Sequence, residues 1–150
     1  MSPESGQEES HMEAAAVANE FIEAFNDADW ERFTATCSRD VVYEEKGSNR
    51  TVKGTDAVLE AAKGWRAAFP DVRGKIFHST AAGTTAALEI TWMGTHSGPL
   101  DLPSGTLPAT GKSVEFDGVQ VFIVEGGKVQ HMRHYLDLLT MLSQVGALPG

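Results

Sequence analysis

The sequence predicts an α+β fold, in which N-terminal helices pack on one face of a curved, antiparallel or mixed sheet and enclose a pocket. In the first half of the chain, apolar residues recur at helical spacing. In the second half, long stretches alternate apolar and polar residues and are separated by turn signals. Helices followed by a run of strands are typical of the α+β class, and a small ligand would sit between the sheet and the helices.

Three helices are expected in the first half of the chain. The first should begin near Met12 and bury one face, made of Val17, Ala18, Phe21, Ile22 and Phe25. Asp29 is placed to cap a second, short helix that carries Cys37. The third should span about residues 56–68, because Pro70 cannot continue it.

Strands are expected wherever short apolar-rich runs alternate in period two. They fall at residues 41–45, 51–53, 72–80, 86–96, 113–125 and 128–136. Gly126-Gly127 is a hairpin turn signal between the last two strands. Residues 97–111, rich in Pro and Gly, should form a loop, and a short apolar tail at 138–145 closes the chain.

The bulk composition limits the class of protein. The 150 residues fit one domain, which we place at residues 11–150 after a polar, disordered arm at 1–10. The net charge of −9, with only 12 scattered Lys and Arg, argues against a nucleic-acid partner. The chain has no apolar run long enough for a membrane span and no signal peptide at its acidic start, so we expect a cytoplasmic protein without a membrane partner.

His134 is the first candidate for catalysis. Strand alternation places it on the same face as Met132 and Leu136, which are apolar, so the imidazole should face the interior. Histidine can take and give a proton near neutral pH. The alternative is a core histidine satisfied by a hydrogen bond.

Asp137 is the second candidate for catalysis. It directly precedes the apolar tail, where a carboxylate can accept the backbone N–H of Leu139 or Thr140 and cap a helix. The capping role is the favoured interpretation.

A set of apolar and polar side chains should form the walls of the pocket and bind the ligand: Trp92, His96, Phe116, Gln120, Phe122 and Met132. Gln120 is the most informative member, because a lone amide among aromatic residues must find a partner or a ligand. His96 would lie at the pocket mouth if its strand stays regular, or in solvent if it does not.

The remaining candidates argue against a metal site. His131 and His134 are three apart on a strand and face opposite sides, which argues against a shared metal ion. The single Cys37 excludes a disulfide framework and a Cys-based zinc site. One of Glu44 and Glu45 should point inward, and the sequence leaves open which one.

Short motifs along nearly the whole chain after the arm carry a family resemblance. They are AFND at 24–27, GWRAAFPD at 64–71, GTHSGP at 94–99, LPATGK at 107–112 and EGGKV at 125–129. Together they resemble the SnoaL-like polyketide cyclases, which belong to the nuclear-transport-factor-2-like cone folds. The resemblance implies a cone-shaped α+β domain and a homodimer.

The resemblance also implies a cofactor-free reaction, the intramolecular aldol closure of a polyketide. The family's catalytic aspartate stands in the last strand, three residues before a second aspartate that matches Asp137; here that position holds His134. We therefore expect acid/base proton transfer on a hydrophobic small molecule, most like a polyketide cyclase. An isomerase, a hydrolase and a non-catalytic small-molecule-binding module are the alternatives. The expected homodimer would cover the convex face of the sheet at Val119, Val121 and Ile123.

Overall fold

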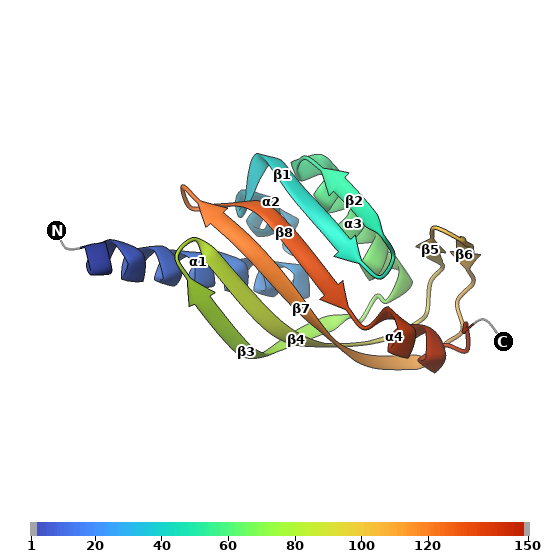
Figure 1. Ribbon diagram of the computed structural model, residues 1–150. Coiled ribbons are helices and arrows are strands. Elements are labelled where there is room, and N and C mark those ends of the chain that lie inside the picture. Colours follow the sequence, from blue (N-terminus) through green and yellow to red (C-terminus); the bar gives the residue numbers. More distant parts are fainter. Residues whose placement is uncertain (1–2, 149–150) are drawn as a thin grey trace.

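The computed structural model describes residues 3–148 (Figure 1). The helices of this part of the chain are α1 (Pro3–Asn26), α2 (Trp30–Ala35), α3 (Thr55–Ala68) and α4 (Leu138–Gln144). Its strands are β1 (Cys37–Lys46), β2 (Arg50–Lys53), β3 (Arg73–Ala82), β4 (Thr85–Thr95), β5 (Leu100–Leu102), β6 (Gly105–Leu107), β7 (Ser113–Glu125) and β8 (Lys128–Leu136).

Six of these strands form one mixed sheet in the order β2-β1-β8-β7-β4-β3. All neighbours are antiparallel except β1 and β8, which run parallel and place Glu45 opposite His134. The long strands β4 and β7 bend along their length (Figure 1). The predicted α+β class is confirmed, with a mixed rather than purely antiparallel sheet.

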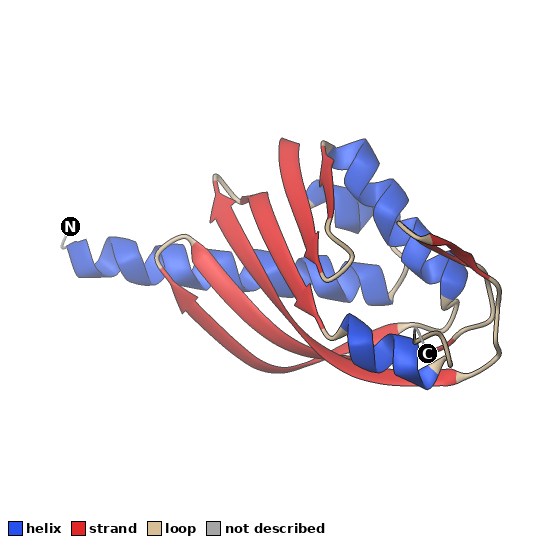
Figure 2. Cartoon of the chain, turned by 45° about the vertical axis from the view of Figure 1, so that its right-hand side comes forward, coloured by secondary structure: helices blue, strands red, loops and turns tan. Residues whose placement is uncertain are grey.

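Helices α1, α2 and α3 lie on one face of the sheet (Figure 2). The strands turn alternate residues toward them, as the period-two pattern predicts. On β4 the buried positions include Leu88, Ile90 and Trp92, and on β7 they include Phe116 and Phe122. This inner face and the apolar faces of the helices form the core.

The first helix begins earlier than expected. It starts at Pro3 instead of near Met12, so most of the segment expected to be a disordered arm is helical. Proline is compatible with the first helical position, and extending an existing helix costs little once its first turn has formed. The first two residues of the expected arm lie outside the described residues.

Two further boundaries differ from the predictions. Cys37 begins β1 instead of belonging to the second helix, because it pairs with Val129 across the parallel strands. The segment expected to be a loop at 97–111 contains the small hairpin of β5 and β6. The apolar tail is the helix α4, which packs against β7.

The outer face of the sheet carries the residues of the expected dimer. Val119, Val121 and Ile123 are half-buried there, and the homodimer stays a prediction. Among the residues described, no helix has the length and apolar character needed to cross a membrane.

Candidate functional site

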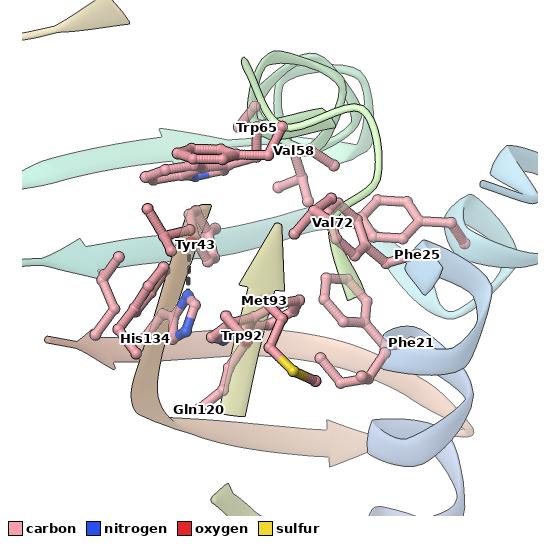
Figure 3. Close-up of a pocket in the computed structure, with 18 residues that line it drawn as sticks. Phe21, Phe25, Tyr43, Val58, Trp65, Val72, Trp92, Met93, Gln120 and His134 are labelled. Carbon is pink, nitrogen blue, oxygen red and sulfur yellow. Dashed lines mark hydrogen bonds between the residues drawn. The ribbon is translucent and has the colours of Figure 1, made fainter. Parts of the chain in front are cut away.

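A cavity lies between the inner face of the sheet and the helices (Figure 3). Its space is about 700 Å³, with the opening to solvent included. Aromatic and aliphatic side chains from α1, α3, β4 and β7 make most of the wall. Five of the lining residues carry polar side-chain atoms, and they are Tyr43, Trp65, Trp92, Gln120 and His134.

His134 lies on β8 and faces this cavity. Its neighbours Met132 and Leu136 are buried on the same face, so the predicted inward orientation is confirmed. The side chain is 8% exposed, and Nδ1 lies 3.0 Å from the hydroxyl of Tyr43 on β1. Figure 3 shows this contact at one end of the pocket.

Behind His134 stands a buried carboxylate, Glu45 on β1, which is 2% exposed. Its oxygen Oε2 accepts hydrogen bonds from the Tyr43 hydroxyl at 2.8 Å, from Trp65 Nε1 at 2.8 Å and from Arg50 Nη2 at 3.0 Å. Its Oε1 accepts from the Ser48 hydroxyl at 2.6 Å. Four donors, one of which (Arg50) also forms an ion pair, thus compensate the cost of burying the charge.

These contacts settle the ionisation of Glu45 and Tyr43. Burial raises the pKa of Glu45, but the hydrogen bond from Ser48, the charge of Arg50 and the bonds from Trp65 and Tyr43 outweigh it, so the pKa is lowered overall. Burial and the neighbouring Glu45 raise the pKa of Tyr43 well above its usual range. At neutral pH the pair is a carboxylate and a neutral phenol.

The same contacts assign the tautomer of His134. The Tyr43 hydroxyl has one proton, and the Glu45 carboxylate can only accept, so Tyr43 donates to Glu45. His134 must then donate its Nδ1–H to the Tyr43 oxygen. Nε2 is therefore left without a proton and is a hydrogen-bond acceptor.

The environment of His134 also favours its neutral form. Burial lowers its pKa to about 4, against a smaller opposite effect of the Glu45 charge. No residue within 3–148 hydrogen-bonds to Nε2. A neutral imidazole with an open acceptor nitrogen thus stands at the pocket wall.

Trp92 supplies the complementary polar atom. Its ring lies 5.9 Å from that of His134, measured between centroids, and the side chain is 7% exposed. Its indole N–H has no hydrogen-bond partner in the described part of the chain. Gln120, on the neighbouring strand β7, donates from Nε2 to the sulfur of Met132 at 3.3 Å.

The structure brings together some of the predicted site residues and separates others. Trp92, Phe116, Gln120 and His134 line the cavity. Three other predicted ligand-binding residues are fully buried outside its lining: His96, Phe122 and Met132. Phe122 packs edge-on against Phe21 of α1 at 5.4 Å, which places it under the helix in the core.

His96 is not at the pocket mouth because β4 ends one residue before it, at Thr95. Its ring packs on Phe69 at 5.3 Å, and Nδ1 lies 3.0 Å from the Thr110 hydroxyl. Burial lowers the pKa of His96. His96 therefore lies neither in the pocket wall nor in solvent. Its contact with Thr110 links the end of β4 to the segment that precedes β7.

Asp137 lies outside the cavity, on the exposed side of β8. Its Oδ1 accepts from the Thr140 backbone N–H at 3.1 Å and its Oδ2 from the Thr140 hydroxyl at 2.6 Å. These bonds lower its pKa and make it the N-cap of α4, which is the role the sequence favours. The structure does not bring it together with His134.

The sequence did not identify the groups behind His134. Neither Tyr43 nor Trp65 was among the predicted site residues, and the choice between Glu44 and Glu45 was open. Period two from the buried Val41 through Tyr43 indicates that Glu45 points inward, so the signal was present. Glu44 faces outward and contacts His131. The two histidines of β8, His131 and His134, therefore lie on opposite faces of the sheet.

No group of three His, Cys, Asp or Glu side chains within residues 3–148 converges in a way that would hold a metal ion. The site consists of an apolar cavity, a neutral imidazole backed by a buried carboxylate, and an indole N–H. Together with the fold, it defines the class: an α+β domain that encloses a mostly apolar pocket.

The chain belongs to the SnoaL-like polyketide cyclase family, whose model matches residues 15–145. No curated protein matches the sequence. Among solved structures, the chain is similar to AclR, a candidate hydroxylase from Streptomyces galilaeus, with 24% identity, coverage of 93% of this chain and 99% of that one, and a TM-score of 0.77.

Two other structures show how broadly this fold is shared. A candidate SnoaL-like polyketide cyclase from Jannaschia sp. CCS1 has 18% identity, covers 99% of this chain and 98% of its own, and has a TM-score of 0.82. An LEH-like epoxide hydrolase from M. tuberculosis has 21% identity, covers 90% of each chain and has a TM-score of 0.70. At these identities the likeness shows the fold, and activity must be argued from the site.

Proposed function

We propose that this protein is a cofactor-independent enzyme that uses His134 as a general base on a hydrophobic, carbonyl-bearing small molecule, most like a polyketide aldol cyclase. The observation that carries the proposal is that His134 lines the cavity and that its buried Nε2 has no hydrogen-bond partner among the described residues. General acid/base help of this kind is typically worth about 10²–10⁴-fold in rate.

The proposed reaction is a balanced proton cycle. Nε2 of His134 removes a proton from the carbon next to a carbonyl group, which leaves an enolate. The enolate carbon then forms a bond to a second carbonyl carbon of the same molecule. The resulting alkoxide takes the proton back from His134, so the protein ends as it began.

Glu45 supports the charged step of this cycle. Once Nε2 is protonated, the imidazolium still donates from Nδ1 to Tyr43, and Tyr43 donates to the carboxylate. The positive charge therefore faces a negative charge across one hydroxyl group, in an interior where charge interactions are strong. Glu45 itself is enclosed by four donors and acts through His134 rather than on the ligand.

A binding module without turnover is the second candidate, and the low basicity of His134 favours it. A base with a pKa of about 4 is always in its acceptor form at neutral pH but removes protons from carbon slowly. Such a nitrogen serves well as a hydrogen-bond acceptor for a ligand.

Hydrogen–deuterium exchange at carbon separates the two candidates. We would incubate 2-tetralone, a small bicyclic ketone, with the protein in D₂O and follow the loss of its α-proton signals by NMR. An enzyme should accelerate the loss, and His134→Gln should abolish the acceleration while the circular dichroism spectrum is retained. His131→Gln is the matched control, because His131 lies on the same strand but faces outward to Glu44.

Exchange that is equally fast with His134→Gln would exclude His134 as the base. Binding of the ketone without any exchange, seen as a change in tryptophan fluorescence from the cavity, would favour the binding module. Trp65 and Trp92 both line the cavity and report on its occupancy.

A further inference from the structure

We propose that the end of the cavity between Trp92 and His134 is a recognition site for a ligand hydroxyl group, so that the ligand is a phenol or an enol on an apolar ring system. This inference rests on the proposed function in that it assigns a ligand class to the same pocket. It does not depend on any bond being made or broken there.

Two polar atoms of residues in this wall lack a hydrogen-bond partner that a ligand could supply. The indole nitrogen of Trp92 and Nε2 of His134 are both enclosed and have no hydrogen-bond partner among the residues that the structure describes. Both side chains are more than nine-tenths buried and line the cavity. Buried polar groups are normally hydrogen-bonded, and exceptions point to a functional role.

The two atoms differ in what they need. The indole N–H is a donor only. Nε2 of His134 is an acceptor only, because the ring proton is held on Nδ1 by Tyr43 and Glu45. One ligand group that accepts a hydrogen bond from Trp92 and donates one to His134 would therefore satisfy both atoms.

A hydroxyl group meets both needs with a single oxygen. A carbonyl oxygen can accept from Trp92 but offers only lone pairs to Nε2. A carboxylate likewise has no proton to donate to Nε2. It would also bring a second negative charge near Glu45, whose ion-pair partner Arg50 already binds Glu45. A neutral amine suits His134 and is a poor acceptor for Trp92.

Two glycines of the sheet leave room for the rings of His134 and Trp92. A Cβ at Gly118 on β7 would lie 3.1 Å from Nε2 of His134, and one at Gly74 on β3 would lie 2.6 Å from the Trp92 ring. The missing side chains let both aromatic rings lie close over the sheet. The hydroxyl-binding pair therefore stands on rigid strands, and the apolar wall at Phe116 and Phe25 receives the rest of the ligand.

The test compares three ligands of nearly the same shape. 2-Naphthol can both accept and donate, 2-naphthaldehyde can only accept, and 2-methylnaphthalene can do neither. Their dissociation constants are measured by ¹H–¹⁵N NMR titration of the whole protein, in which the indole N–H signals of the tryptophans are resolved. The Trp92 signal is identified by its loss in Trp92→Phe.

We expect 2-naphthol to bind about tenfold more tightly than either other ligand, which corresponds to about 1.4 kcal/mol. It should also shift the Trp92 indole signal to lower field. Trp92→Phe should reduce the affinity for 2-naphthol to that for 2-methylnaphthalene. Trp30→Phe, at a tryptophan outside the cavity lining, should leave the preference unchanged.

Equal affinity for the three ligands, tightest binding of the aldehyde, or no binding of any of them would overturn the proposal. The wild-type ligand series decides this even if Trp92→Phe does not fold. A hydroxyl preference without proton exchange on 2-tetralone would reject the enzyme and keep this site. Proton exchange on 2-tetralone without a preference for 2-naphthol would reject this site and keep the enzyme.

Discussion

The neutral, buried His134 should make the protein sensitive to mild acid. Its pKa is about 4 in the folded protein and has an ordinary value of 6.5 in the unfolded chain. The unfolded chain therefore binds the proton more readily, so the stability is complete above pH 6.5 and is lost as the pH falls toward 4. At about 1.4 kcal/mol for each tenfold difference in proton affinity, the full loss is about 3 kcal/mol.

By pH 5 about 2 kcal/mol of this should already be lost, because the unfolded histidine is then almost fully protonated and the folded one is not. The assay is urea unfolding of the wild type and of His134→Gln at pH values from 7.5 to 5, since glutamine does not titrate. The difference in unfolding free energy between the two proteins isolates His134. The lowered pKa of His96 contributes equally to both proteins and cancels.

The titration of Glu45 does not interfere with this measurement in the pH range used. The pKa of Glu45 is lowered, so Glu45 stays ionised down to pH 5. A difference between wild type and variant that does not change over this range would refute the burial of a neutral His134. A difference that grows in favour of the wild type at low pH would show that the imidazole is charged in the folded protein.

Three other substitutions test the parts of the site. Tyr43→Phe should destabilise the fold by about 1–3 kcal/mol and release the tautomer of His134, so that ¹⁵N NMR of the neutral imidazole shows a mixture of the Nδ1–H and Nε2–H forms. Gly118→Ala should lower the melting temperature and displace the His134 ring, whose signals then shift, because the new methyl lies 3.1 Å from Nε2. Asp137→Ala should cost about 1 kcal/mol through loss of the α4 cap and leave naphthol affinity unchanged; altered affinity would contradict its purely structural role.

The main helices and the six strands of the sheet could be predicted because they show their own periodicity, whereas the β5–β6 hairpin could not. The long strands β7 and β8 and the hairpin between them follow from alternation and Gly126-Gly127, and the orientation of Gln120 and His134 follows from the same alternation. Predictions failed where the regular pattern stops. His96 stands just after the end of β4, so its side chain does not continue the face of Trp92.

The partners in the site could not be predicted, because they come from elements distant in sequence. Tyr43 and His134 are 91 residues apart, and they meet only through the parallel pairing of β1 with β8. Trp65 reaches Glu45 from α3, which no local pattern indicates. Sequence periodicity predicts which face a residue takes, and the pairing of strands decides what it finds there.

The parallel pairing also explains how the site accommodates a histidine at the position where the family resemblance expects an aspartate. Burial in this apolar position lowers the pKa of the imidazole. Glu45 lies directly opposite on the neighbouring strand and places a carboxylate one hydroxyl away from the ring. The carboxylate thus stands one strand over, on β1, and holds the proton of His134 on Nδ1 through Tyr43. Nε2, which has no hydrogen-bond partner among the described residues, is left as an acceptor.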